Sequence, residues 1–201
     1  MRHPAVAVAP GTCYGRSDVR LADAPALTVD TWLARLALCL PAGRGAALTV
    51  DSSPLTRCLS VAEALAESLN AVVRSDPRLQ EMDFGAWELQ RWDDIDRAAL
   101  DAWAADLRAA RPHGGETLDA FAARLASWTR DALHEGAAAP SRGVSSAPRL
   151  IVTHAGVIRV LTALLLQRRA DACLGWPLSL GGICHLHRTA RGAWQVLRWN
   201  A

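Results

Sequence analysis

The chain has 201 residues, which is enough for one well-buried domain and short for two. Apolar residues make up 51% of the sequence and charged residues 21%, a balance typical of a globular fold and not of a disordered chain. The net charge of +2 is too small, and its arginines too scattered, to favour a nucleic-acid-binding protein. We therefore expect a single domain over residues 1–201 that binds no nucleic acid.

The cysteines are odd in number, and no pair has the spacing of a zinc-binding motif: Cys13, Cys39, Cys58, Cys173 and Cys184. This pattern predicts free thiols, without a disulfide framework and without a metal site. No signal peptide is visible, and the apolar run at 161–166 is far too short to cross a bilayer. The expectation is a cytoplasmic protein that does not associate with a membrane.

The first half of the chain alternates between helical and strand patterns. Residues 10–18 are rich in turn formers and predict a loop, and leucines at helical spacing predict a helix over 28–40 that Pro41 ends. A buried strand over 47–50 leads to a turn at 52–54, where Pro54 begins a helix that continues through Leu69. A second short strand is expected at 71–73.

The second half continues this alternation. Tryptophans and leucines on related faces predict a helix over 91–110, and a glycine-rich turn at 112–116 separates it from a helix over 117–134. A surface loop is expected over 136–148, a buried strand over 150–152, a helix over 156–166 and a hairpin formed by 183–187 and 193–199. The order predicts an α/β fold, a three-layer α/β/α domain with a largely parallel central sheet.

Residues suited to phosphate chemistry occur in short motifs along this pattern. Arg2-His3-Pro4 opens the chain, Arg57 follows the turn at 52–54, Glu81 follows the second strand and His154 follows the strand at 150–152. A neutral imidazole is a competent nucleophile near pH 7. Arginine forks match phosphate oxygens, and a carboxyl group can protonate a leaving oxygen. These residue types suit phosphoryl transfer through a phosphohistidine, with no metal and no cofactor.

In this order the motifs resemble those of the histidine phosphatase superfamily, which also contains the cofactor-dependent phosphoglycerate mutases. Arg2-His3-Pro4 resembles the family's Arg-His-Gly signature, and residues 53–57 resemble its second arginine motif. Residues 81–88 resemble the segment of its proton donor, residues 114–117 its glycine-glycine-glutamate loop, and residues 153–156 its second histidine. The resemblance runs through nearly the whole chain.

The resemblance implies a role for each matching residue. His3 would be the nucleophile, and Arg2, Arg57 and His154 would hold the phosphate oxygens. Glu81 would protonate the departing alkoxide and later help to deprotonate the attacking water. The helix after the second histidine would aim its first amides at the same anion. The implied partner is a small phosphorylated metabolite, and the implied activity is that of a metal-independent phosphatase.

Several alternatives stay open at the level of sequence. Residues 11–19 look most like α-ribazole phosphatases of cobalamin assembly, but the motifs also fit mutase-type phosphotransfer and a non-catalytic phospholigand-binding protein derived from a phosphatase. Asp83 and Glu88 are close enough in sequence to compete with Glu81 as the proton donor. Arg16 could reach a phosphate or form a loop salt bridge. The sequence does not indicate an oligomeric state.

Relatives place a buried central strand directly before the Arg-His motif, whereas here Met1 alone precedes Arg2. We expect either that the protein begins upstream of Met1, which is our preferred interpretation, or that the sheet lacks this strand. In both cases the first strand is predicted to be truncated. Cys58 is expected to be a small buried side chain. The histidines outside the motifs are expected at surface or strand positions: His113, His134, His185 and His187.

Overall fold

The computed structural model describes residues 1–23, 28–39, 48–134 and 148–201. The α-helices are α1 (Val29–Ala37), α2 (Thr56–Leu69), α3 (Arg97–Ala105), α4 (Leu118–His134) and α5 (Ala155–Leu165). The strands are β1 (Thr49–Ser52), β2 (Val72–Ser75), β3 (Arg149–Val152), β4 (His185–Arg188) and β5 (Trp194–Arg198). The loop expected over 136–148 lies outside the described residues except for Pro148, as do Leu40 and Ala47 at the ends of two predicted elements.

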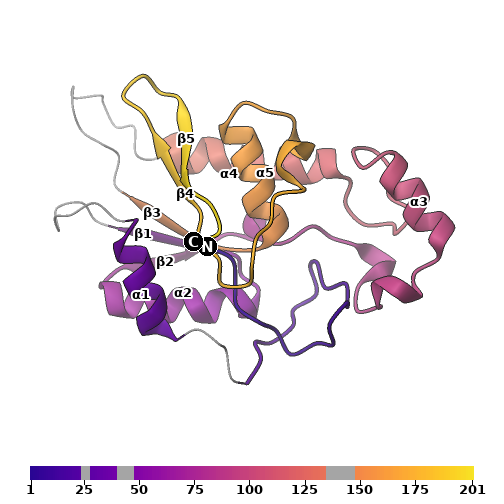
Figure 1. Ribbon diagram of the computed structural model, residues 1–201, viewed down its shortest axis with the longest axis horizontal. Helices are drawn as coiled ribbons and strands as arrows, with labels where there is room; N and C mark the ends of the chain where they lie inside the picture. The colour runs from indigo at the N-terminus through magenta and orange to yellow at the C-terminus, as the bar shows by residue number, and fades with distance from the viewer. Residues whose placement is uncertain (24–27, 40–47, 135–147) are drawn as a thin grey trace.

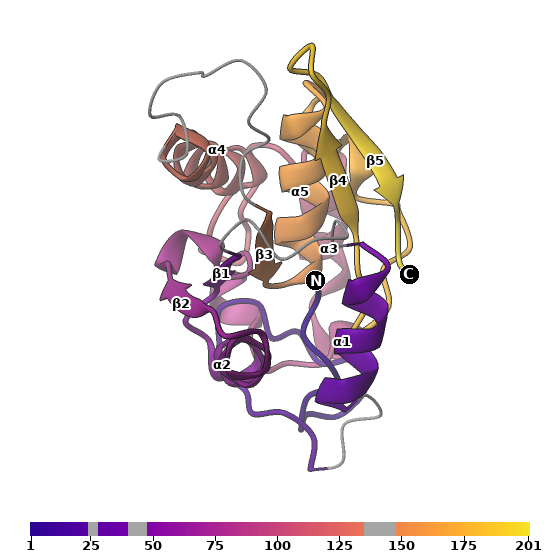
Figure 2. The same ribbon diagram turned by 90° about the vertical axis from the view of Figure 1, so that its left-hand side faces the viewer.

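A parallel sheet of order β2-β1-β3 lies between two layers of helices (Figure 1). Helices α1 and α2 cover one face of this sheet, and α4 and α5 cover the other (Figure 2). The strands β4 and β5 form the antiparallel hairpin that the sequence predicts, and this hairpin lies beside α5. The three-layer α/β/α prediction is therefore confirmed.

The alternation of side chains along the strands produces this layering. In β3, Leu150 and Val152 belong to the apolar cluster with α1 and α2, whereas Ile151 packs on the cluster with α4 and α5. Strand β2 lies at the edge of the sheet, and Val72 is correspondingly 76% exposed. The carboxyl ends of β1 and β3 lie next to each other, because Ser52 is paired with Val152.

The first residues of the chain lie beside β3. Arg2 forms a single parallel bridge with Thr153. The Thr153 amide donates to the Met1 carbonyl at 2.9 Å, and the His3 amide donates to the Thr153 carbonyl at 3.0 Å. On the other side, the Arg2 amide donates to the Gly182 carbonyl at 3.0 Å. Residues 1–3 therefore form a single bridge to the sheet, and this bridge holds His3 at the sheet's end.

The helix predicted over 91–110 is shorter than expected. Residues 92–94 form a separate 3₁₀ turn, and α3 begins only at Arg97, since the side chain of Asp96 accepts from the Ala99 amide at 2.8 Å. Trp92 and Trp103 pack on Trp87 in an aromatic cluster away from the sheet. In the described part of the chain, no helix is both long enough and apolar enough to cross a membrane.

Candidate functional site

His3 lies at the end of the sheet with only 2% of its surface exposed. Its Nδ1 is 2.7 Å from the carbonyl oxygen of Pro4. Because a carbonyl oxygen can only accept, Nδ1 carries the proton and Nε2 keeps its lone pair. Burial, assisted by the positive charges of Arg57 and Arg2, lowers the pKa of His3 to about 3. The imidazole is therefore neutral near pH 7, with Nε2 available as a nucleophile.

His154 is the N-cap residue of α5 and is fully buried beside His3, with 5.3 Å between the ring centroids. Arg57 Nε donates to its Nδ1 at 3.3 Å, so Nε2 carries the proton and donates to Ser53 Oγ at 2.8 Å. Burial, followed by the charge of Arg57, lowers the pKa of His154 well below its ordinary value. The two neutral imidazoles therefore differ at Nε2, which has a lone pair in His3 and carries a proton in His154.

Arg57 lies in the first turn of α2 and is fully buried, below the loop that follows the opening motif. Its Nη1 donates to the Ser17 carbonyl at 2.6 Å, and its Nη2 donates to the Gly15 carbonyl at 2.6 Å and the Tyr14 carbonyl at 3.2 Å. The loop over residues 14–17 therefore occupies most of the guanidinium donors. An anion that binds Arg57 bidentately must replace some of these carbonyls.

Arg2 has a donor that the surrounding protein leaves unused. Its Nη1 donates to the Leu178 carbonyl at 2.6 Å, whereas its Nε is buried without a hydrogen-bond partner among the described residues. Burial and then the charge of Arg2 lower the pKa of Arg159, so a further guanidinium lies in the same electrostatic field. Sequence reasoning assigned no role to Arg159, although its place one turn into α5 after His154 is a usable signal.

Glu81 lies against the beginning of α5. Its carboxylate accepts from the Gly156 amide at 2.9 Å and from the Met82 amide at 3.1 Å. A Cβ on Gly156 would be 2.4 Å from Glu81 Oε1, so the approach of the carboxylate requires glycine at this position. The Gly156 amide thus has a partner within the protein, and the expectation that the first amides of α5 point toward a bound anion stays a prediction.

The neighbouring carboxylates have other partners. Glu88 accepts from the Arg16 and Ser17 amides at 2.6 and 2.5 Å. Asp83 forms a salt bridge with Arg16 at 3.3 Å, which is one of the two roles considered for that arginine. Of Glu81, Asp83 and Glu88, it is Glu81 that contacts the helix carrying His154.

Arg124 of α4 fixes the backbone around Glu81. Its guanidinium forms a bidentate pair with Glu116, at 2.9 and 2.8 Å, and both side chains are largely buried. The same guanidinium donates to the Arg78 and Gln80 carbonyls at 2.7 and 3.0 Å. The segment before Glu81 is thereby tied to the loop that carries Glu116.

Two glycines allow this loop to cross the segment after Glu81 in close contact. A Cβ on Gly115 would be 2.2 Å from the Asp83 carbonyl oxygen, and a Cβ on Gly85 would be 2.2 Å from the His113 carbonyl oxygen.

His113 itself is 2% exposed, and its ring packs 4.8 Å from that of Trp87. The surface position expected for His113 is wrong, because its ring fills the aromatic cluster. His185 and His187 lie in β4 as expected, and the side chain of His134 lies outside the described residues.

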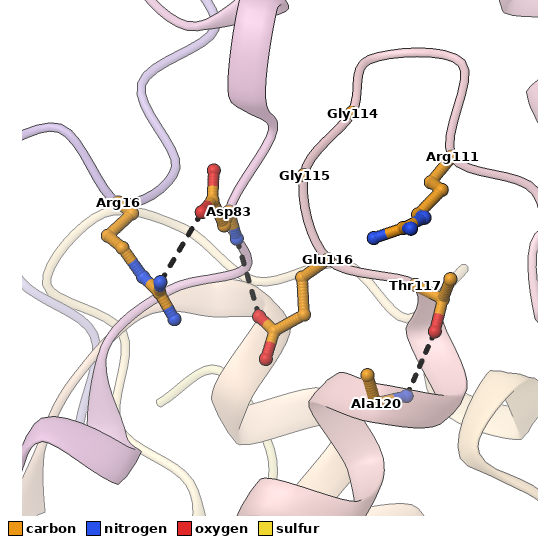
Figure 3. Close-up of a pocket in the computed structure, with 8 residues that line it drawn as sticks. All are labelled: Arg16, Asp83, Arg111, Gly114, Gly115, Glu116, Thr117 and Ala120. Carbon is orange, nitrogen blue, oxygen red and sulfur yellow. Dashed lines mark hydrogen bonds and ion pairs between the residues drawn. The ribbon is translucent and has the colours of Figure 1, made fainter.

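A pocket of about 340 Å³ opens beside this crossing (Figure 3). It is lined by residues of three segments, which are Arg16, Asp83, Arg111, Gly114, Gly115, Glu116, Thr117 and Ala120. Arg16 adjoins the carbonyls that hold Arg57, and Asp83 follows Glu81 by two residues. Two of the residues that line the pocket thus belong to the loop that holds Arg57 and to the segment that follows Glu81.

Neither the Cys58 thiol nor the possible metal-ligating side chains among the described residues indicate a further reactive site. Cys58 is buried against His154, with Sγ 3.5 Å from Nε2, and burial raises the pKa of its thiol to about 12. The expectation of a small buried Cys58 is confirmed. Among the residues that the structure describes, no group of three or more His, Cys, Asp or Glu side chains is arranged to hold a metal ion.

The chain is similar in sequence to a known family and to known phosphatases. The sequence model of the histidine phosphatase superfamily (branch 1) matches residues 1–201. The glucosyl-3-phosphoglycerate phosphatase of Mycolicibacterium vanbaalenii is 35% identical over 176 residues, which cover 77% of this chain and 74% of the relative. The adenosylcobalamin/alpha-ribazole phosphatase of Escherichia coli is 30% identical over 151 residues, which cover 74% of this chain and 65% of that protein.

A solved structure shows the same fold over the whole chain. The structure of a mycobacterial glucosyl-3-phosphoglycerate phosphatase in complex with VO3 superimposes with a TM-score of 0.81 at 25% identity. The match covers 100% of this chain and 96% of that one. The fold in Figure 1 is therefore also the fold of this solved structure.

Proposed function

Because the chain belongs to the histidine phosphatase superfamily, we propose that it hydrolyses phosphomonoesters through a phosphohistidine on His3. The observation that carries this proposal is the state of the His3 ring. The Pro4 carbonyl fixes its proton on Nδ1, and burial keeps it neutral, so that Nε2 has a lone pair. A second neutral imidazole and two arginines lie beside it. A neutral nucleophile next to fixed cations suits attack on a phosphate dianion.

In the first step, Nε2 of His3 attacks phosphorus and the bond from phosphorus to the ester oxygen breaks. Glu81, protonated at this stage, gives its proton to the leaving oxygen, so the alcohol departs neutral. Arg2, Arg57 and the N–H of His154 bind the phosphoryl oxygens. For Arg57 this requires the phosphate to replace carbonyls of the loop over 14–17, and for His154 it requires a phosphoryl oxygen to replace Ser53 Oγ as the acceptor of the Nε2 proton.

In the second step, water attacks the phosphorus of the phosphohistidine. The Glu81 carboxylate accepts a proton from this water, and the bond from phosphorus to Nε2 breaks. Inorganic phosphate leaves, His3 recovers its lone pair, and Glu81 is again protonated for the next ester. One carboxyl group thus serves both steps, consistent with the contact of Glu81 with α5, the helix that His154 caps.

The substrate we propose is a small phosphorylated metabolite. Residues 11–19 and the E. coli relative favour α-ribazole 5'-phosphate of cobalamin synthesis, whereas the M. vanbaalenii relative favours glucosyl-3-phosphoglycerate. We propose a single cytoplasmic domain. The presence of both His3 and Glu81 argues against the binding-only alternative, because binding alone requires neither a nucleophile nor an acid.

The test is to trap the intermediate. The protein is incubated briefly with ³²P-labelled phosphomonoesters, including both candidate substrates, and the protein-bound label is counted. We expect a label that is lost in acid, kept in base and absent in the His3→Ala variant. No label and no turnover with any ester would support the binding-only protein. Transfer of the label to an added alcohol in preference to water would support mutase-type chemistry.

A further inference from the structure

The opening motif is held on two sides, by β3 and by a segment over residues 178–182 that precedes the β4-β5 hairpin. The Arg2 amide donates to the Gly182 carbonyl at 3.0 Å, and the Gly181 amide donates to the His3 carbonyl at 3.1 Å. Because the motif forms a single bridge with β3, these two hydrogen bonds contribute strongly to fixing the backbone that carries the nucleophile.

Asn200 holds this segment from its other side. Its Oδ1 accepts from the Ser179 amide at 2.7 Å, and its Nδ2 donates to Ser179 Oγ at 3.2 Å. A Cβ on Gly182 would be 2.5 Å from Asn200 Oδ1, so the asparagine side chain packs directly against the residue whose carbonyl accepts from Arg2.

The backbone of residues 199–201 supports this contact. Ala201 and Ile183 exchange two backbone hydrogen bonds, at 3.0 and 3.1 Å, which place residues 199–201 alongside the segment (Figure 1). Asn200 has a φ of 57°, in the left-handed region that asparagine tolerates better than most residues other than glycine. The residue type therefore suits both the backbone conformation and the hydrogen bonds to Ser179.

Trp199 holds the backbone next to the carbonyl that binds the Arg2 side chain. Its Nε1 donates to the Pro177 carbonyl at 2.6 Å, and its ring packs edge to face on that of Trp176, with 4.9 Å between the centroids. The next carbonyl along the chain, that of Leu178, accepts from Arg2 Nη1 at 2.6 Å. The guanidinium of Arg2 is thus connected to Trp199 through two adjacent carbonyls.

We propose that Asn200 and Trp199 are positioning residues of the phosphatase reaction. Asn200 acts on His3 through the turn over residues 179–182, and Trp199 acts on Arg2 through the Leu178 carbonyl. This inference rests on the proposed phosphohistidine mechanism. Asn200 should therefore determine the rate of attack on phosphorus, whereas Trp199 should determine the affinity for the phosphate oxygens.

The first test removes the Asn200 side chain without straining its backbone. Glycine adopts a positive φ readily, so Asn200→Gly deletes the two hydrogen bonds to Ser179 and keeps the local conformation. We expect the rate of ³²P transfer to His3 in a single turnover to fall about 10- to 10²-fold, the scale of a misplaced reacting group. The loss should be equal for glycerol 3-phosphate and p-nitrophenyl phosphate, because Asn200 does not act on the leaving group. Asn200→Asp should keep most of the rate, since a carboxylate oxygen still accepts from the Ser179 amide.

Asn70→Gly is the matched control. Asn70 follows α2 with a φ of 50°, and its side chain forms no hydrogen bond with the described residues. This variant should label at the rate of the wild type. A wild-type rate in Asn200→Gly, an equal loss in both glycine variants, or an equal loss in Asn200→Asp would overturn the role of Asn200.

Trp199→Phe keeps an aromatic ring and removes the N–H donor. We expect calorimetric titration with inorganic phosphate to show a Kd about threefold to tenfold higher than that of the wild type, the scale of one hydrogen bond. The rate of label transfer at saturating ester should change little. Trp194→Phe is the control, because Trp194 lies in β5 and its indole forms no hydrogen bond with the described residues. Equal Kd values for Trp199→Phe and the wild type would overturn the role of Trp199.

Amide hydrogen exchange separates a failure of this inference from a failure of the phosphatase proposal. The Arg2 and Gly181 amides, followed by NMR, should exchange faster in Asn200→Gly than in Asn70→Gly, because their hydrogen bonds depend on the turn that Asn200 holds. Faster exchange without hydrolysis of any ester would refute the phosphatase and support the contact between Asn200 and the motif. Unchanged exchange would refute that contact even in an active enzyme.

Discussion

Arg57 and Arg111 carry the same functional group, but their surroundings are opposite. Arg57 is fully buried, and its guanidinium is held by backbone carbonyls of residues 14–17 and by His154. Arg111 is exposed, and the described residues leave its guanidinium donors unused. A buried cation with backbone partners is fixed in place and cannot be exchanged without cost. An exposed cation is exchanged at little cost, so we expect substitutions at Arg111 to be tolerated and those at Arg57 to be damaging.

The largest effect should come from removing the nucleophile of the buried centre. We expect His3→Ala to reduce phosphomonoester turnover by roughly 10⁴-fold or more, the scale seen when a covalent nucleophile is removed. Steady-state assays with p-nitrophenyl phosphate measure this, with a chelator added in parallel to exclude a contaminating metal-dependent phosphatase. Turnover in His3→Ala equal to that of the wild type would eliminate the phosphohistidine mechanism.

Glu81→Gln should separate the acid from the phosphate-binding groups. A general acid matters most when the leaving group is poor, so we expect a loss of about 10²–10⁴-fold with alkyl phosphates and a much smaller loss with p-nitrophenyl phosphate. The ratio of kcat/KM for the two ester types is the quantity to measure. Equal losses would point to Asp83 or Glu88 as the donor. The comparison is made with the variants Asp83→Asn and Glu88→Gln, in which each carboxylate is replaced by its amide.

The contrast between the two arginines predicts different stabilities for the same substitution. Lysine keeps the charge but cannot donate to several carbonyls in one plane. Arg57→Lys should therefore lower the free energy of unfolding by about 2–4 kcal/mol, since it leaves buried carbonyls without donors. Arg111→Lys should change it by less than about 0.5 kcal/mol, as is usual at the surface. Urea denaturation of both variants measures the difference, and similar values would contradict the contrast.

A substitution at Gly156 should have a smaller effect on turnover, because it displaces the Glu81 carboxylate without removing it. In Gly156→Ala the new Cβ would be 2.4 Å from Glu81 Oε1, so the carboxylate must move. Misplacing a catalytic group by about 1 Å can cost on the order of 10²-fold in rate, and we expect a loss of about 10 to 10²-fold with alkyl phosphates. Gly175→Ala is the control, because a Cβ there meets no atom within 4 Å. Equal activity of the two variants would show that Glu81 tolerates displacement.

The buried imidazoles also predict a dependence of stability on pH. The pKa of His3 is lowered to about 3, and that of His154 is also well below its ordinary value, whereas an unfolded histidine titrates near 6.5. Below about pH 6.5 the unfolded chain therefore binds more protons than the folded protein, and each histidine should destabilise the fold by up to about 1.4 kcal/mol per unit of decreasing pH. Denaturation at pH 7, 6 and 5 measures the slope. An unchanged slope in His3→Asn would contradict this assignment.

The parts of the site that depend on local patterns could be predicted from the sequence. Helix α2 after Pro54 and the position of His154 directly after a strand follow from apolar spacing and turn residues, and the structure places both as expected. The pairing of Arg2 with Thr153 brings the two histidine motifs together as parallel strands require.

The parts that depend on contacts between distant segments could not be predicted. The carbonyls that hold Arg57 belong to a loop about 40 residues earlier in the chain. Because every residue has a backbone carbonyl, the residue types in that loop do not indicate that it binds Arg57. The same is true of the Pro4 carbonyl at His3. His113 was misplaced because an isolated histidine in a polar turn has the pattern of a surface residue. Its burial comes from the tryptophans around it.

The close crossing of Gly85 and Gly115 constrains how this protein can be recombined with its relatives. A Cβ at either glycine would overlap a carbonyl oxygen of the opposite segment, and the two segments also share the Glu116 amide's hydrogen bond to the Asp83 carbonyl at 2.8 Å. Transplanting the loop over residues 111–117 from another family member therefore requires a compatible backbone over residues 83–86. A chimaera that exchanges both segments together should keep Glu81 in place, whereas one that exchanges a single segment should shift it. We therefore expect the loop over residues 111–117 and the segment over residues 83–86 to diverge together among relatives.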